Sequence, residues 1–168
     1  EQNQNNIKIN FTDGETDEVD YLVVSDGVFS NNKSIIENKN YKPDYYGAVA
    51  LRTIINREEV KNFDKNNISL LMSSNAHAVL YAINEKEHNL VTTIRSKIKN
   101  FEKINNLDFI KTILKNSILK NNNSFTPLFE GDLTCWPIYT SDKPIVSKFK
   151  NIFYLGDAFC TLPPTMAQ

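Results

Sequence analysis

The 168-residue sequence contains only two cysteines, two histidines and five glycines. Cys135 and Cys160 stand neither in a CxxC pair nor at metal-ligand spacing from a histidine. This scarcity argues against a zinc site, and a chain of this length does not need a disulfide framework. We therefore expect no metal, and we expect both cysteines to be small buried thiols.

Long apolar runs and a strong excess of charge are also missing. No segment reaches the about 20 apolar residues that span a bilayer, and the first residues do not show a signal-peptide pattern. The net charge of -1 gives no electrostatic basis for binding nucleic acid. We expect a cytoplasmic protein with no transmembrane segment and no nucleic acid partner, while peripheral membrane association and the oligomeric state stay open.

The apolar residues that are present mostly follow the period of β-strands. Ile7, Ile9 and Phe11 alternate with polar residues, which is typical of a half-buried strand. Asp13-Gly14 then supplies a tight turn, so residues 7–24 predict a hairpin whose return strand runs over 19–24. That return strand has consecutive apolar residues, and we expect it to be covered on both faces.

Further β-strand patterns dominate the middle of the chain. Apolar runs at 45–55, 68–74, 77–83 and 89–96, joined by short links, predict an antiparallel sheet. Residues 105–122 switch to a helical period and predict a surface helix packed on it. The run at 133–140 predicts an edge strand because it contains Pro137. The fold class is therefore α+β, mainly antiparallel sheet with packed helices.

Two segments place an aspartate beside a glycine where an apolar strand ends. They are YLVVSDGVFS, with Asp26-Gly27, and FYLGDAFC, with Gly156-Asp157. Glycine lets backbone amides approach a phosphate closely, and a carboxylate accepts hydrogen bonds from sugar hydroxyls. Each segment alone is more typical of an ordinary turn.

Together and in this order, the two segments resemble the Asp-Gly and Gly-Asp motifs of the FAD-dependent aromatic hydroxylases. This flavoprotein family includes p-hydroxybenzoate, salicylate and ubiquinone-pathway hydroxylases. Between the motifs, YYGAVALRTII and SSNAHAVLYAI resemble the family's substrate-domain strands, especially in the salicylate-hydroxylase-like branch. The resemblance implies an internal segment of a longer monooxygenase, and we expect this segment to be inactive and to hold FAD poorly by itself.

The resemblance also implies a division of the chain and a set of cofactors. Residues 1–40 and 151–168 would be parts of an FAD-binding α/β domain, and residues 41–150 would form the substrate-binding sheet domain. The parent protein would hydroxylate a small aromatic substrate with FAD as cofactor, NAD(P)H as co-substrate and O2. The residues implied in FAD binding are Asp26, Gly27, Gly156, Asp157, Pro164, Thr165, Met166, Ala167 and Gln168.

Individual roles follow from the same resemblance. Asp157 would accept a hydrogen bond from the ribityl or ribose hydroxyls of FAD, and the turn through residues 164–168 would run beside the isoalloxazine ring. Ser30 would cap the helix after the first motif. Lys33 stands where the family usually has arginine, and a solvated surface cation is an equal alternative. We expect the carboxylates of Asp26 and Asp157 at neighbouring strand exits, facing a common groove.

Three residues of the sheet are candidates for substrate binding: Arg52, His77 and Tyr81. Arg52 is the only cation in an apolar strand, and a desolvated charge needs a partner. Either a protein carboxylate or an anionic substrate group would serve. His77, on the turn before the run at 78–83, and Tyr81, within that run, could point into the same pocket, although each alone is more typical of a structural residue. No catalytic residue is assigned.

The sequence is also compatible with other functions. A reductase or a halogenase on the same flavoprotein fold would share both motifs, and a non-catalytic β-rich binding module would explain the strands. The sequence decides neither the substrate nor the choice between NADH and NADPH.

Overall fold

The computed structural model describes residues 6–61, 63–96, 108, 112 and 132–164. The chain divides into two compact units, Glu1–Asp44 with Tyr139–Gln168, and Tyr45–Ile138. The predicted helix over 105–122 lies outside the described residues except for positions 108 and 112. The boundaries at 40/41 and 150/151 between the FAD-binding parts and the substrate-binding domain stay a prediction.

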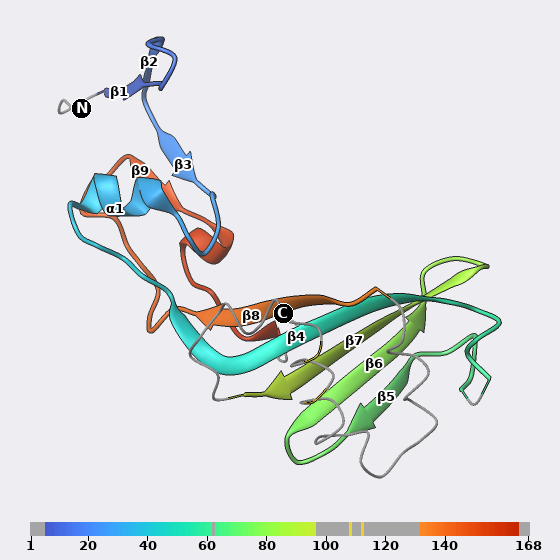
Figure 1. The fold of residues 1–168 in the computed structure, drawn as a ribbon. Coiled ribbons are helices and arrows are strands. Elements are labelled where there is room, and N and C mark those ends of the chain that lie inside the picture. The colour runs from blue at the N-terminus through green and yellow to red at the C-terminus, as the bar shows by residue number, and fades with distance from the viewer. Residues whose placement is uncertain (1–5, 62, 97–107, 109–111, 113–131, 165–168) are drawn as a thin grey trace. The chain divides into compact units, whose positions relative to one another are not determined.

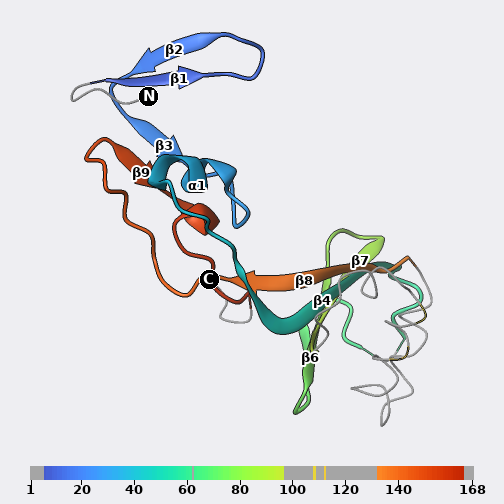
Figure 2. The same cartoon turned by 60° about the vertical axis from the view of Figure 1, so that its left-hand side comes forward.

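The first unit begins with the predicted hairpin (Figure 2). Strands β1 (Ile7–Asn10) and β2 (Thr16–Val19) pair antiparallel around a turn in which the Gly14 amide donates to the Phe11 carbonyl. The predicted return strand over 19–24 is wrong in its bounds. Thr16–Val19 forms it, although it contains only one apolar residue, because the turn is short and sets the register.

Strand β3 (Leu22–Val24) is a separate element that pairs in parallel with β9 (Ile152–Tyr154), about 130 residues further along the chain by their numbering. Helix α1 (Asn31–Glu37) follows β3. Buried side chains from β1, β3 and β9 pack into one core with Ala158. The expectation that 19–24 is covered on both faces is wrong, since the Val23 side chain is 52% exposed.

The second unit contains most of a five-stranded sheet, with the order β5-β6-β7-β4-β8 (Figure 1). The pairs β5–β6, β6–β7 and β4–β7 are antiparallel, as predicted. Strand β8, which contains Pro137, lies at the edge of the sheet, as predicted. The strands are β4 (Asp44–Asn56), β5 (Ser69–Met72), β6 (Ala76–Ala82), β7 (Glu87–Arg95) and β8 (Thr134–Thr140).

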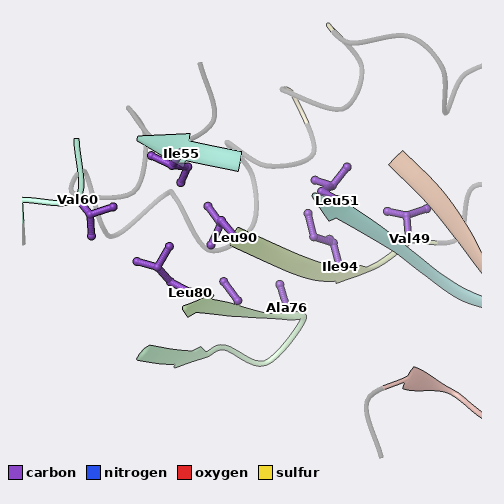
Figure 3. Packing of buried hydrophobic residues seen from close by; sticks show 9 residues of the cluster. Val49, Leu51, Ile55, Val60, Ala76, Leu80, Leu90 and Ile94 are labelled. Carbon is purple, nitrogen blue, oxygen red and sulfur yellow. The ribbon is translucent and has the colours of Figure 1, made fainter. Parts of the chain in front are cut away.

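One face of this sheet carries the hydrophobic core (Figure 3). Because side chains alternate along a strand, residues two apart on β4, β6 and β7 share this face. Leu51, Leu80 and Leu90 are at most 1% exposed and are among its largest fully buried side chains. The opposite face therefore holds the residues between them, including all three candidates for substrate binding. The α+β fold with a mainly antiparallel sheet is confirmed.

No helix among the described residues is both long and apolar enough to cross a membrane.

Candidate functional site

The Asp-Gly and Gly-Asp segments leave adjacent strands at the same edge of a small parallel sheet. Val24 on β3 is paired with Tyr154 on β9, and the Leu155 amide donates a 3.0 Å hydrogen bond to the Val24 carbonyl. Parallel strands end at a common edge, so both segments begin there. The prediction that Asp26 and Asp157 stand at neighbouring strand exits is confirmed.

Both exits turn on a glycine in the left-handed region. Gly27 has a φ of +84° and Gly156 a φ of +56°, a conformation that other residues adopt only with strain. After Gly27 the chain enters α1, and after Leu155 it enters a 3-10 turn over Gly156–Ala158. These turns explain locally why an aspartate is accompanied by a glycine in each segment.

The two carboxylates differ in their surroundings. Asp26 accepts a 2.9 Å hydrogen bond from the Asn32 side chain in the first turn of α1. Asp157 is exposed, and among the described residues its carboxylate has no hydrogen-bond partner, while its backbone carbonyl accepts a 2.9 Å bond from Thr161 Oγ1. Its backbone is thus held while its carboxylate is available to a ligand.

Helix α1 fixes a buried cation between the two exits. The Ser30 hydroxyl accepts a 3.0 Å hydrogen bond from the Lys33 amide, which confirms Ser30 as the helix cap. The Lys33 side chain is only 4% exposed, and its Nζ atom donates a 3.4 Å bond to the Ala158 carbonyl. Burial lowers the pKa of this ammonium below 10.5, against the opposing effect of the negative charge of Asp26. The alternative of a solvated surface cation is therefore wrong.

A groove of about 870 Å³ runs along β3 and α1 as far as Asp26. Its walls are mostly apolar, with Ile7, Leu22 and Ile36 among the lining residues. Asp157 does not line it, so a groove shared by the two carboxylates stays a prediction. Further along the second motif Pro164 is exposed, and the candidates Thr165, Met166, Ala167 and Gln168 lie outside the described residues.

The candidates for substrate binding lie on the face of the sheet opposite the core. In the register, Tyr81 is opposite Asn89, and Arg52 is opposite Val91, two residues further along β7. Directly opposite residues share a face, and so do residues two apart, which places Arg52, His77 and Tyr81 on one face. His77 is about 13 Å from Tyr81 along β6, and no hydrogen bond joins them among the described residues.

Asn89 connects two of these candidates. Arg52 Nε donates a 2.6 Å hydrogen bond to Asn89 Oδ1, and Asn89 Nδ2 donates a 2.8 Å bond to the Tyr81 hydroxyl. Sequence analysis did not identify Asn89. Its only signal is an amide at the start of a β-favouring run, and the pairing register is needed to see what it contacts.

The two cysteines depart from the expectation of buried thiols, since both are half-buried. Cys135 on β8 packs against the core of the sheet, and this burial raises the pKa of its thiol to about 11. A thiol of this kind is protonated at neutral pH and is a poor nucleophile.

Comparison with solved structures identifies the fold. HpxO from Klebsiella pneumoniae, complexed with FAD and uric acid, matches 100% of this chain with 43% of its own, at a TM-score of 0.80 and 15% identity. The 2,6-dihydroxypyridine-3-hydroxylase of Arthrobacter nicotinovorans matches 98% of this chain with 48% of its own, at a TM-score of 0.76 and 14% identity. This chain has the fold of the FAD-dependent aromatic hydroxylases. A salicylate hydroxylase substrate complex matches at a TM-score of 0.75 and 14% identity, covering 98% of this chain and 45% of its own.

The resemblance of the sequence to these hydroxylases is thus confirmed at the level of fold. The chain spans less than half the length of the hydroxylase structures that it matches. No protein-family model matches the sequence, and no curated protein matches it.

Proposed function

We propose that this chain is part of an FAD-dependent monooxygenase that hydroxylates a small aromatic substrate with NAD(P)H and O2. The observation that carries the proposal is the meeting of the Asp-Gly and Gly-Asp segments at one edge of the β3–β9 sheet. This edge is where open α/β sheets bind nucleotide cofactors. The likeness to structures crystallised with FAD supports the same conclusion.

The residues at this edge fit an FAD molecule chemically. Asp157 offers an exposed carboxylate without a protein partner among the described residues, which suits the hydroxyls of the ribityl chain or ribose. Gly27 and Gly156 keep side chains away from the points where the strands end. Pro164 and residues 165–168 would continue along the isoalloxazine ring. FAD, when bound, would supply the oxygen activation and accept the hydride from NAD(P)H.

The face of the sheet that carries Arg52, His77 and Tyr81 would bind and orient the aromatic ring. All three side chains offer hydrogen-bond donors, and the apolar residues around them, such as Ile54, would cover the faces of the ring. Orientation of the ring and exclusion of water are the contributions that a protein makes to this chemistry.

Flavin binding and product analysis test the proposal. The complete gene product that carries this sequence is expected to show the visible absorbance of bound FAD. Asp157→Asn is expected to weaken FAD binding about tenfold or more, since a charge-assisted hydrogen bond is lost. Asp20→Asn, at an exposed position between β2 and β3, is the matched control.

Turnover distinguishes hydroxylation from other flavin reactions. Incubation with NAD(P)H, 18O2 and phenolic substrates is expected to give a product that carries one 18O atom. A gene product that binds no FAD would contradict the proposal, as would flavin-dependent reduction or halogenation without oxygen incorporation.

A further inference from the structure

Strand β5 (Ser69–Met72) forms one edge of the five-stranded sheet (Figure 1). It pairs with β6 on its inner side, and among the described residues no strand pairs with its outer side. The outer side of an edge strand presents unpaired backbone amides and carbonyls, with which another strand can form hydrogen bonds. The outer side of β5 is therefore a place where a further strand can extend the sheet.

The pairing of β5 with β6 determines which backbone groups point outward. The Ser73 amide donates a 2.8 Å hydrogen bond to the Ala76 carbonyl, and this pair continues the antiparallel register of the two strands. Along such a ladder, residues whose amide and carbonyl point toward the neighbouring strand alternate with residues whose groups point away. Counted back from Ser73, the outward groups belong to Ile68, Leu70 and Met72.

The side chains of these same three residues are apolar and exposed, and we call the three residues the β5 edge. Ile68 is 71% exposed, Leu70 57% and Met72 79%. Leu71, which lies between two of them, packs against the core of the sheet, so the β5 edge lies on the opposite face. Large apolar side chains gathered on a surface are typical of an interaction site.

The sequence around β5 lacks the features that usually keep an edge strand from pairing. Residues 68–83 contain no Asp, Glu, Lys or Arg and no proline, although 23% of the chain is charged. The register between β5 and β6 runs without a bulge. Charged side chains, proline and bulges are common means by which proteins protect an edge strand. An edge without them, carrying exposed apolar side chains, is expected to be covered by another strand.

A second copy of this chain offers a strand that matches the β5 edge. In a contact with two-fold symmetry, a residue that meets another residue of the partner is itself met by the same two residues in reverse. With the axis at Leu70, this residue lies opposite Leu70 of the second copy, and Ile68 lies opposite Met72 of that copy. Each of these pairs exchanges two backbone hydrogen bonds, because the groups of all three residues point outward. The β5 edge is uncharged, so the pairing opposes no like charges.

We propose that two copies of this chain associate by antiparallel pairing of their β5 edges, which joins their sheets into one continuous sheet. The contact is short, since β5 has four residues, and small contacts are typical of transient complexes. We therefore expect a reversible dimer with a dissociation constant on the order of 10 μM. This inference concerns assembly and does not rest on the proposed function.

Sedimentation velocity of the complete gene product tests the association at protein concentrations from about 1 to about 100 μM. The wild type is expected to change from monomer to dimer over this range. Leu70→Lys places two positive charges opposite each other on the axis and is expected to weaken the dimer about tenfold or more. Ile83→Lys, which adds the same charge at an exposed position just after β6, is the matched control and should dimerise like the wild type.

Leu70→Cys tests the position of the axis and does not depend on weakening the protein. The Cα atoms of a hydrogen-bonded antiparallel pair are about 5.5 Å apart, which is within the range of a disulfide. Mild oxidation is expected to link two copies through this position, as shown by non-reducing electrophoresis and peptide mass spectrometry. Asn75→Cys, on the exposed turn before β6, should give no comparable cross-link.

Hydrogen exchange identifies what covers the β5 edge. Amide exchange in residues 68–73 of the wild type is expected to become slower as the protein concentration rises, because dimerisation protects the outward amides. Protection that is equal at all concentrations would mean that another part of the same gene product covers the edge, and it would overturn the inference. A wild type that stays monomeric up to about 100 μM, or a dimer that survives unchanged in Leu70→Lys, would overturn it as well.

Discussion

The Nζ atom of Lys33 donates a 3.4 Å hydrogen bond to the carbonyl of Ala158, and this contact joins the helix after the first motif to the turn of the second. The side chain is 4% exposed, with the Asp26 carboxylate close enough to act on its charge. Ala158 is itself completely buried. A buried cation therefore connects the two segments that follow β3 and β9, at the edge where we propose that FAD binds.

Lys33→Met is expected to change the pH dependence of stability. Burial lowers the pKa of Lys33 in the folded chain below 10.5, the ordinary value that applies in the unfolded chain. At a pH between the folded and the unfolded pKa, the unfolded chain therefore binds more protons than the folded one. The cost of burying the charge is present in full at neutral pH and is relieved as the pH rises toward 10.5. The free energy of unfolding of the wild type relative to Lys33→Met should therefore increase from pH 7 to pH 10, as measured by urea titration.

Lys42→Met, which removes an exposed lysine, controls for the loss of a positive charge. If the difference between the wild type and Lys33→Met stays constant or shrinks as the pH rises, Lys33 is not destabilised by burial.

Ser30→Ala is expected to destabilise the first unit by about 1 kcal/mol, because the Lys33 amide loses its cap. The capping hydroxyl survives in Ser30→Thr, which should retain most of the stability. Urea unfolding of the three proteins measures the difference. A cost as large for threonine as for alanine would show that packing of the buried Ser30 side chain, and not the cap, is the cause.

Local sequence patterns predicted the elements of this fold better than their long-range contacts. The alternation of Ile7 and Ile9 and the turn at Gly14 were sufficient for a hairpin, because their determinants lie within a few residues. The apolar runs of the large sheet were equally clear. Pro137 indicated an edge strand through the hydrogen bond that proline cannot donate.

The contacts that build the candidate site are long-range, and the sequence did not reveal them. The burial of Lys33 depends on Ala158, 125 residues further along the chain. Asn89 acquires its role only when the register places it between Arg52 and Tyr81. The bounds of the return strand were wrong because pairing, and not apolar content, selected Thr16–Val19.

Tyr154→Phe is expected to cost about 1.5–3 kcal/mol of stability, the range for a hydrogen bond to a charged group. The Tyr154 hydroxyl donates a 2.8 Å bond to Glu37 Oε1, which also accepts from Ser147 Oγ at 2.9 Å. Burial, followed by the hydrogen bond to Glu37 and the negative charge of that residue, raises the pKa of this phenol well above 10. Urea unfolding at pH 7 measures the loss.

Tyr21→Phe removes the hydroxyl of a tyrosine that is 69% exposed, and it should leave stability unchanged. If Tyr154→Phe and Tyr21→Phe change the free energy of unfolding equally, the hydrogen bond between Tyr154 and Glu37 contributes no more to stability than a hydrogen bond to water.

Cys135 should resist alkylation in the folded protein. Burial raises the pKa of its thiol to about 11, so at pH 8 roughly a thousandth of it is the reactive thiolate. Iodoacetamide at pH 8 is expected to leave Cys135 unmodified in native buffer and to modify it rapidly in urea, as followed by peptide mass spectrometry. Cys135→Ser assigns the modified peptide. Modification in native buffer at the rate found in urea would mean that β8 exposes the thiol, and the packing of Cys135 against the sheet core would then be wrong.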